Sequence, residues 1–107
     1  MAVESDAEGI NSQNEHAKML LRLKSTNEAK EILDDLVWKS RETLGDDHPV
    51  TLRVMATFGD SLLELGFPDG ALQIHETVLK LRREALGDTH PETDESRRRV
   101  AELQQLP

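Results

Sequence analysis

Apolar residues recur along this chain at the three- and four-residue spacing of an amphipathic helix. One such stripe, over residues 27–44, comprises Ala29, Ile32, Leu33, Leu36 and Val37. Two others lie over residues 50–65 and 70–86, comprising Val54, Met55, Phe58, Leu62 and Leu65, then Ala71, Ile74, Val78 and Leu79. No segment of useful length alternates with period two, as a half-buried strand would. The pattern therefore predicts an all-α fold.

Glycine and proline separate these stripes. Gly45 and Gly87 each follow a stripe, and glycine adopts the positive φ at which many helices end. Pro49 and Pro91 suit the first turn of the next helix. We expect about five antiparallel helices joined by short loops, at residues 11–24, 27–44, 50–65, 69–86 and 92–105. Residues 1–9 are expected to form a disordered acidic tail before a helical domain over residues 10–107.

The chain repeats itself with an offset of 42 residues. The hexapeptide Leu-Gly-Asp-Asp-His-Pro at 44–49 recurs as Leu-Gly-Asp-Thr-His-Pro at 86–91. The same offset pairs Ala29 with Ala71, Ile32 with Ile74, Arg41 with Arg83, Glu42 with Glu84, and Thr51 with Thr93. A single helical hairpin cannot bury its own apolar face, but stacked hairpins can. The offset therefore predicts repeats over about 10–48 and 49–90, followed by a closing helix over 91–106.

These repeats resemble the tetratricopeptide repeat, and more narrowly the 42-residue variety found in kinesin light chains. In the second repeat Gly59 resembles the family's small residue in the first helix, Gly66 the turn glycine, and Ala71 the small residue that opens the second helix. The first repeat departs from the pattern, with Lys24 at the turn glycine and His16 at an apolar position. The resemblance implies a short α-solenoid whose first helices, one per repeat, line a concave side that binds a peptide or protein.

The charge balance narrows the choice of partner. Charged residues make up 32% of the 107 residues, and the net charge is −8. Such a surface disfavours nucleic acid and anionic membranes. No apolar run approaches the roughly 20 residues that span a bilayer. The absence of cysteine excludes disulfides and mildly favours a reducing, cytoplasmic setting, and residues 1–9 lack the features of a secretory signal.

No residue pattern points to catalysis, a cofactor or a metal. His48 and His90 occupy equivalent links, and stacked repeats place such links on the order of 10 Å apart, too far for one ion. His75 lies on an inward stripe and is interpreted as a core residue with a satisfied ring. Glycines next to a Lys-Ser/Thr pair, as a phosphate-binding loop requires, are absent. We therefore expect a non-catalytic interaction module.

The expected binding residues lie on the sides of the first helices that face away from the apolar stripes. They are Asn11, Asn14, Lys18, Arg22, Arg53, Asp60, Glu64, Arg98 and Glu102. Their mixed charge favours a ligand of mixed charge. An equally weighted alternative is that this is only the solvated face of each helix. Trp38 lies on the opposite, acidic side of its helix and is either an anchor for a partner on the convex face or packed against a neighbouring segment.

Two other roles for the same fold stay open. The chain could be a structural fragment that self-associates, for example as a homodimer, or a regulatory subunit of a signalling enzyme. Fold alone does not choose among them.

Overall fold

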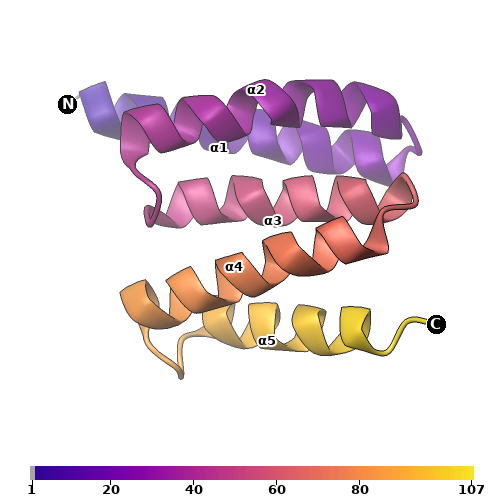
Figure 1. The fold of residues 1–107 in the computed structure, drawn as a ribbon. Coiled ribbons are helices and arrows are strands. Elements are labelled where there is room, and N and C mark those ends of the chain that lie inside the picture. Colours follow the sequence, from indigo (N-terminus) through magenta and orange to yellow (C-terminus); the bar gives the residue numbers. More distant parts are fainter. Residues whose placement is uncertain (1) are drawn as a thin grey trace.

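The computed structural model describes residues 2–107 as a row of antiparallel helices (Figure 1). The helices are α1 (Ala2–Arg22), α2 (Thr26–Leu44), α3 (Pro49–Glu64), α4 (Pro68–Leu86) and α5 (Pro91–Gln104). No strand occurs within these residues, so the predicted all-α solenoid is confirmed. Four of the five expected helices begin and end within about two residues of the structural bounds.

The first helix is longer than the sequence suggested. The structure places residues 2–9, expected as a disordered tail, at the start of α1; Met1 lies outside the described residues. This segment contains no proline, and its alanines and glutamates are good helix formers. Ala7 also packs against the apolar core, and Ile10 is buried. Acidic composition alone therefore gave a misleading indication of disorder.

An apolar cluster joins the first three helices. Its buried members are Ile10, Ala17, Leu20, Ala29, Leu33, Leu36, Val50 and Val54. Helix α3 packs against both α1 and α2, and α4 and α5 follow in sequence order. The inward stripe predicted for α2 thus lies in this cluster, whereas of the stripe predicted for α3 only Val54 is buried and Phe58 packs against the cluster in part.

The repeated links end one helix and begin the next in the same way. Gly45 and Gly87 have φ of 98° and 93°, as expected for glycines that stop a helix. His48 Nδ1 accepts a hydrogen bond from the Val50 backbone N–H at 3.1 Å, and His90 Nδ1 accepts one from Glu92 N–H at 3.0 Å. Each histidine therefore satisfies a free donor in the first turn of the following helix, the role usually taken by Ser, Thr, Asp or Asn.

The turn between α1 and α2 holds a residue poorly suited to it. Lys24 has φ of 65°, whereas Gly66 has φ of 92° in the turn between α3 and α4. A side chain in this left-handed region is strained, whereas glycine is not. We expect Lys24→Gly to raise the free energy of unfolding by about 0.5–1 kcal/mol, measured by denaturant titration.

A matched control is Lys24→Ala. It removes the same exposed ion pair to Glu64, at 3.5 Å, but keeps the Cβ atom. An equal gain from both substitutions would contradict the explanation by backbone strain.

Among the described helices, none is both long enough and apolar enough to cross a bilayer.

Candidate functional site

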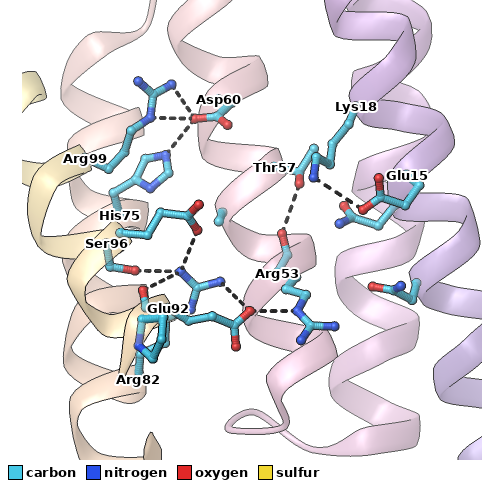
Figure 2. A pocket seen from close by; sticks show the side chains of 15 residues that line it. Glu15, Lys18, Arg53, Thr57, Asp60, His75, Arg82, Glu92, Ser96 and Arg99 are labelled. Carbon is cyan, nitrogen blue, oxygen red and sulfur yellow. Dashed lines mark hydrogen bonds and ion pairs between the residues drawn. The ribbon is translucent and has the colours of Figure 1, made fainter. Parts of the chain in front are cut away.

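A groove of about 490 Å³ runs along one side of the molecule, between α1, α3 and α5. Side chains from α4 reach it from between α3 and α5 (Figure 2). Most of its lining residues have polar side chains; the lining comprises Asn11, Asn14, Glu15, Lys18, Arg53, Ala56, Thr57, Asp60, His75, Arg82, Pro91, Glu92, Glu95, Ser96 and Arg99. The groove therefore offers hydrogen-bonding groups and charges of both signs.

The structure brings together most, but not all, of the expected binding residues. Those that line the groove are Asn11, Asn14, Lys18, Arg53 and Asp60. Arg22 and Glu64 line an adjoining hollow of about 310 Å³ that shares Lys18 and Asp60 with the groove. Arg98 and Glu102 line neither of these hollows.

On α5, the expected residue Arg98 does not face the groove. The buried residues of α5 are Thr93, Ser96, Val100 and Leu103. At about 100° per residue, Arg98 lies nearly opposite this stripe and points away from the fold. It is 69% exposed and pairs with Asp94, whereas Arg99 turns into the groove. The 42-residue offset thus located the helix, and it also pairs Arg53 with Glu95, which lines the groove, but it did not indicate Arg99.

The side chains of His75 and Arg99 converge on Asp60 (Figure 2). Asp60 Oδ1 accepts from His75 Nε2 at 3.0 Å and from two nitrogens of Arg99, the nearer at 2.6 Å. Burial would raise the pKa of Asp60, but the hydrogen bonds from His75 and Arg99 outweigh it and hold that pKa below its ordinary value. An ionised carboxylate only accepts, so the proton of the His75 ring lies on Nε2.

Arg82 is a buried cation in the part of the groove nearest α5. Its side chain is 3% exposed and donates to Ser96 Oγ at 2.8 Å and to the Glu92 carbonyl oxygen at 3.2 Å. The carboxylates of Glu92 and Glu95 lie 3.9 and 3.7 Å away. Burial lowers the pKa of the guanidinium, and the two carboxylates partly offset that effect. The charge is thus compensated by α5, the helix that covers it.

Arg53 completes this part of the groove. Its Nε donates to Glu92 Oε2 at 2.8 Å, and its side chain is 42% exposed. Glu92 thereby lies between Arg53 of α3 and Arg82 of α4. Three helices meet at this one carboxylate.

On the α1 side of the groove, some buried polar atoms lack hydrogen-bond partners. Asn14 is 1% exposed, and its Oδ1 has no hydrogen-bond partner; the same holds for the buried Oδ1 of Asn11. Lys18 pairs with Glu15 across one helical turn at 3.3 Å, with both side chains about half exposed. Buried polar atoms normally have partners. This side of the groove therefore retains unused hydrogen-bonding capacity.

A sequence model of the tetratricopeptide repeat matches residues 10–50 and 51–92, which together form most of the chain. The chain belongs to the tetratricopeptide repeat family. Repeats of this family are generally protein–protein interaction modules. The two matched units also agree with the 42-residue offset of the sequence.

Two solved structures have the same fold. One is the crystal structure of nearly identical TPR-like repeats from Podosopora anserina, assigned to a kinesin light chain. It superposes on this chain with a TM-score of 0.83 at 24% identity, over 92% of this chain and 47% of that one. A single-substitution variant of those repeats gives 0.81 at 24% identity, over 91% and 46%. This chain therefore spans about half the length of these tetratricopeptide structures. No curated protein sequence matches it significantly.

Sequence reasoning missed what the second helix of a tetratricopeptide hairpin contributes to the groove. His75 and Arg82 share one stripe of α4 with Ala71 and Val78. His75 was correctly interpreted as a core residue, since it is 3% exposed and hydrogen-bonded. The sequence does contain a signal for Arg82. It is a cation on the same helical stripe as Ala71 and Val78, at the position that the small residue Ser40 holds one repeat earlier.

Trp38 is 68% exposed on α2, as its position on the helical wheel predicted. It borders a separate hollow of about 430 Å³ with Arg41, Glu42, Gly45 and Asp46. Arg41 and Asp46 form an ion pair there at 2.8 Å. A role for Trp38 in binding a partner on the convex face of this tetratricopeptide array stays a prediction.

Within the described side chains, no group of three or more histidine, cysteine or acidic residues is placed to hold a metal ion.

Proposed function

We propose that this tetratricopeptide repeat chain is a non-catalytic module that binds an extended segment of another protein in the groove between α1, α3 and α5. The unpartnered Oδ1 of Asn14 carries the proposal. That side chain lines the groove and is 1% exposed, and a buried amide oxygen without a donor costs free energy. A small movement of the Asn14 side chain would bring this oxygen within reach of a backbone N–H of the bound segment.

The amide groups of Asn11 and Asn14 suit a ligand with an exposed backbone. An asparagine side chain both donates and accepts, so it can pair with the N–H and C=O of an extended segment. A helical ligand has already used most of these groups internally. We therefore favour an extended segment over a helix.

The charges of the groove suit a ligand of mixed sign. Lys18 and Arg53 supply cationic groups near α1 and α3, and Glu92 and Glu95 supply anionic groups at α5. Exposed and half-exposed charges are screened by salt. Binding is accordingly expected to weaken as salt rises, and neither a uniformly acidic nor a uniformly basic segment should bind best.

The test is a charge reversal in the groove. Peptides selected on the native chain from a random library of extended sequences should bind Lys18→Glu/Arg53→Glu at least tenfold more weakly, by fluorescence anisotropy. The matched control is Lys80→Glu/Arg98→Glu, with the same change in net charge at exposed positions of α4 and α5 outside the groove lining. Circular dichroism must stay native in both variants.

Lys18→Glu alone is a necessary companion, because Arg53→Glu also breaks the ion pair to Glu92. We expect Lys18→Glu alone to weaken binding several-fold. Native affinity in the groove variants, or an equal loss in the control, would exclude the groove as the site. The convex face around Trp38 would then be the better candidate.

The remaining features of the chain agree with such a module in a reducing compartment. None of its 107 residues is a cysteine, and its net charge of −8 disfavours nucleic acid.

A further inference from the structure

Helix α5 is attached to the rest of the array differently from the other helices. The packed helix pairs among the described residues are α1–α2, α1–α3, α2–α3, α3–α4 and α4–α5. Thus α1 and α3 pack directly on one another, but α3 and α5 do not. Whatever fixes α5 relative to α3 must be made by side chains or by α4.

Two ion pairs span from α3 to α5 along the groove. Arg53 Nε lies 2.8 Å from Glu92 Oε2, and Arg99 Nη2 lies 2.6 Å from Asp60 Oδ1. Their polarity is reversed, since α3 supplies the cation in one and the anion in the other. Each joins residues 39 apart in sequence.

Both pairs are supported from beneath by buried polar groups of α4. His75 donates to Asp60, and Arg82 lies against Glu92 and Ser96 (Figure 2). Burial would lower the pKa of Arg99, but its hydrogen bonds to Asp60 and Glu102 outweigh burial and raise that pKa. The acidic member of each ion pair therefore has a second contact, to a buried side chain of α4.

Apolar packing of α5 is slight by comparison. Its buried apolar side chains are Val100 and Leu103, and its other buried residues, Thr93 and Ser96, are polar. At this interface Thr93 Oγ1 and Arg82 Nε have no hydrogen-bond partner. Polar contacts thus contribute to the attachment of α5 beside its packing on α4.

The corresponding positions one repeat earlier, on α1 and α3, form no such ion pairs. At an offset of 42 residues, the positions of Arg53 and Glu92 are held by Asn11 and Val50, and those of Asp60 and Arg99 by Lys18 and Thr57. Neither combination can form an ion pair. Within the described residues, the pairs Arg53–Glu92 and Asp60–Arg99 thus join two helices that do not pack directly on one another.

We propose that the ion pairs Arg53–Glu92 and Asp60–Arg99 form a latch that holds α5 against α3 and sets the width of the groove at that end. Salt or loss of one latch charge loosens α5 on α4 and widens the groove between α3 and α5. The helices α1 to α3 stay in place, because the apolar cluster that joins them does not depend on the latch. This inference goes beyond the proposed function and concerns the free protein.

Hydrogen–deuterium exchange of the free chain tests the latch. At about 1 M NaCl, where the Debye length is about 3 Å, we expect α5 amides to exchange about tenfold faster than at low salt, while α1 and α2 amides change little. Asp60→Asn and Arg99→Gln should each produce a similar acceleration at low salt. Because each breaks the same pair, the double variant should exchange little faster than either one.

The matched control is Arg98→Gln. It removes one charge and one ion pair of α5, to Asp94 at 3.2 Å, but that pair lies within the helix and does not reach α3. Salt-insensitive exchange of α5, additive effects in the double variant, or an equal acceleration by Arg98→Gln would each overturn the latch.

A distance measurement tests the change in width. The chain has no cysteine, so spin labels at Ser12→Cys on α1 and Arg98→Cys on α5 report one distance without background labelling. Both positions are exposed. We expect Asp60→Asn to lengthen and broaden the distance distribution, and an unchanged distribution would refute the widening. Neither measurement uses a ligand, so the latch and the proposed function can fail separately.

Discussion

Replacing Leu33 with alanine is expected to lower the free energy of unfolding by about 3 kcal/mol, the middle of the range for buried leucines. Leu33 is 0% exposed on α2, within the apolar cluster that joins α1, α2 and α3. The substitution removes its buried methyl groups and leaves a cavity that packed helices fill only partly. Denaturant titration followed by circular dichroism measures the change.

The control is Leu23→Ala, in the turn after α1. Leu23 is 67% exposed, so its truncation should change the free energy of unfolding by less than about 0.5 kcal/mol. Similar losses for the two leucines would mean that the cluster of α1 to α3 does not dominate the stability of the chain.

Replacing Gly59 with alanine is expected to destabilise the chain by about 1–2 kcal/mol, although alanine is the better helix former. A Cβ atom at Gly59 would lie 2.8 Å from His75 Nε2 and 3.2 Å from Ile74 Cγ2. The ring of His75 cannot retreat easily, because it is 3% exposed and hydrogen-bonded to Asp60. The cost of overpacking should therefore exceed the gain of about 1 kcal/mol in helix propensity.

Gly9→Ala provides the opposite case on α1. A Cβ atom there would meet nothing within 4 Å beyond its chain neighbours and the adjacent backbone of α1, so only the propensity gain remains. We expect it to raise the free energy of unfolding by about 0.5–1 kcal/mol. The two glycines should thus respond with opposite signs in the same denaturant titration. Stabilisation by both alanines would contradict a close approach of α4 to Gly59.

The sequence predicted the helices well because their signals are local. The period of the apolar stripes defines α2, α3 and α4, and glycine and proline mark their ends within a residue or two. The start of α1 could not be predicted in this way. No glycine–proline link marks where this helix begins, and its first turns are supported by the burial of Ile10. That support comes from helices that follow later in the chain.

The candidate site was predictable only where the repeat imposes its geometry. Asn14, Lys18 and Asp60 could be assigned because one helical face recurs along α1 and α3. Arg99 could not, because its direction depends on how α5 rests on α4 through polar contacts. For Arg82, helical periodicity indicates the buried stripe of α4 but not the carboxylates of Glu92 and Glu95 that compensate its charge.

The apolar cluster of α1 to α3 and the polar contacts that hold α5 also bear on how the chain folds. Each helix packs mainly on its neighbours in sequence, so contact order is low and folding is expected on the microsecond-to-millisecond scale. The apolar cluster makes α1 to α3 the natural nucleus, from which order propagates along the array. Helix α5 would then form its native contacts last, after the folding barrier has been crossed. Mutations at Asp60 or Arg99 should accordingly speed unfolding while leaving the folding rate almost unchanged.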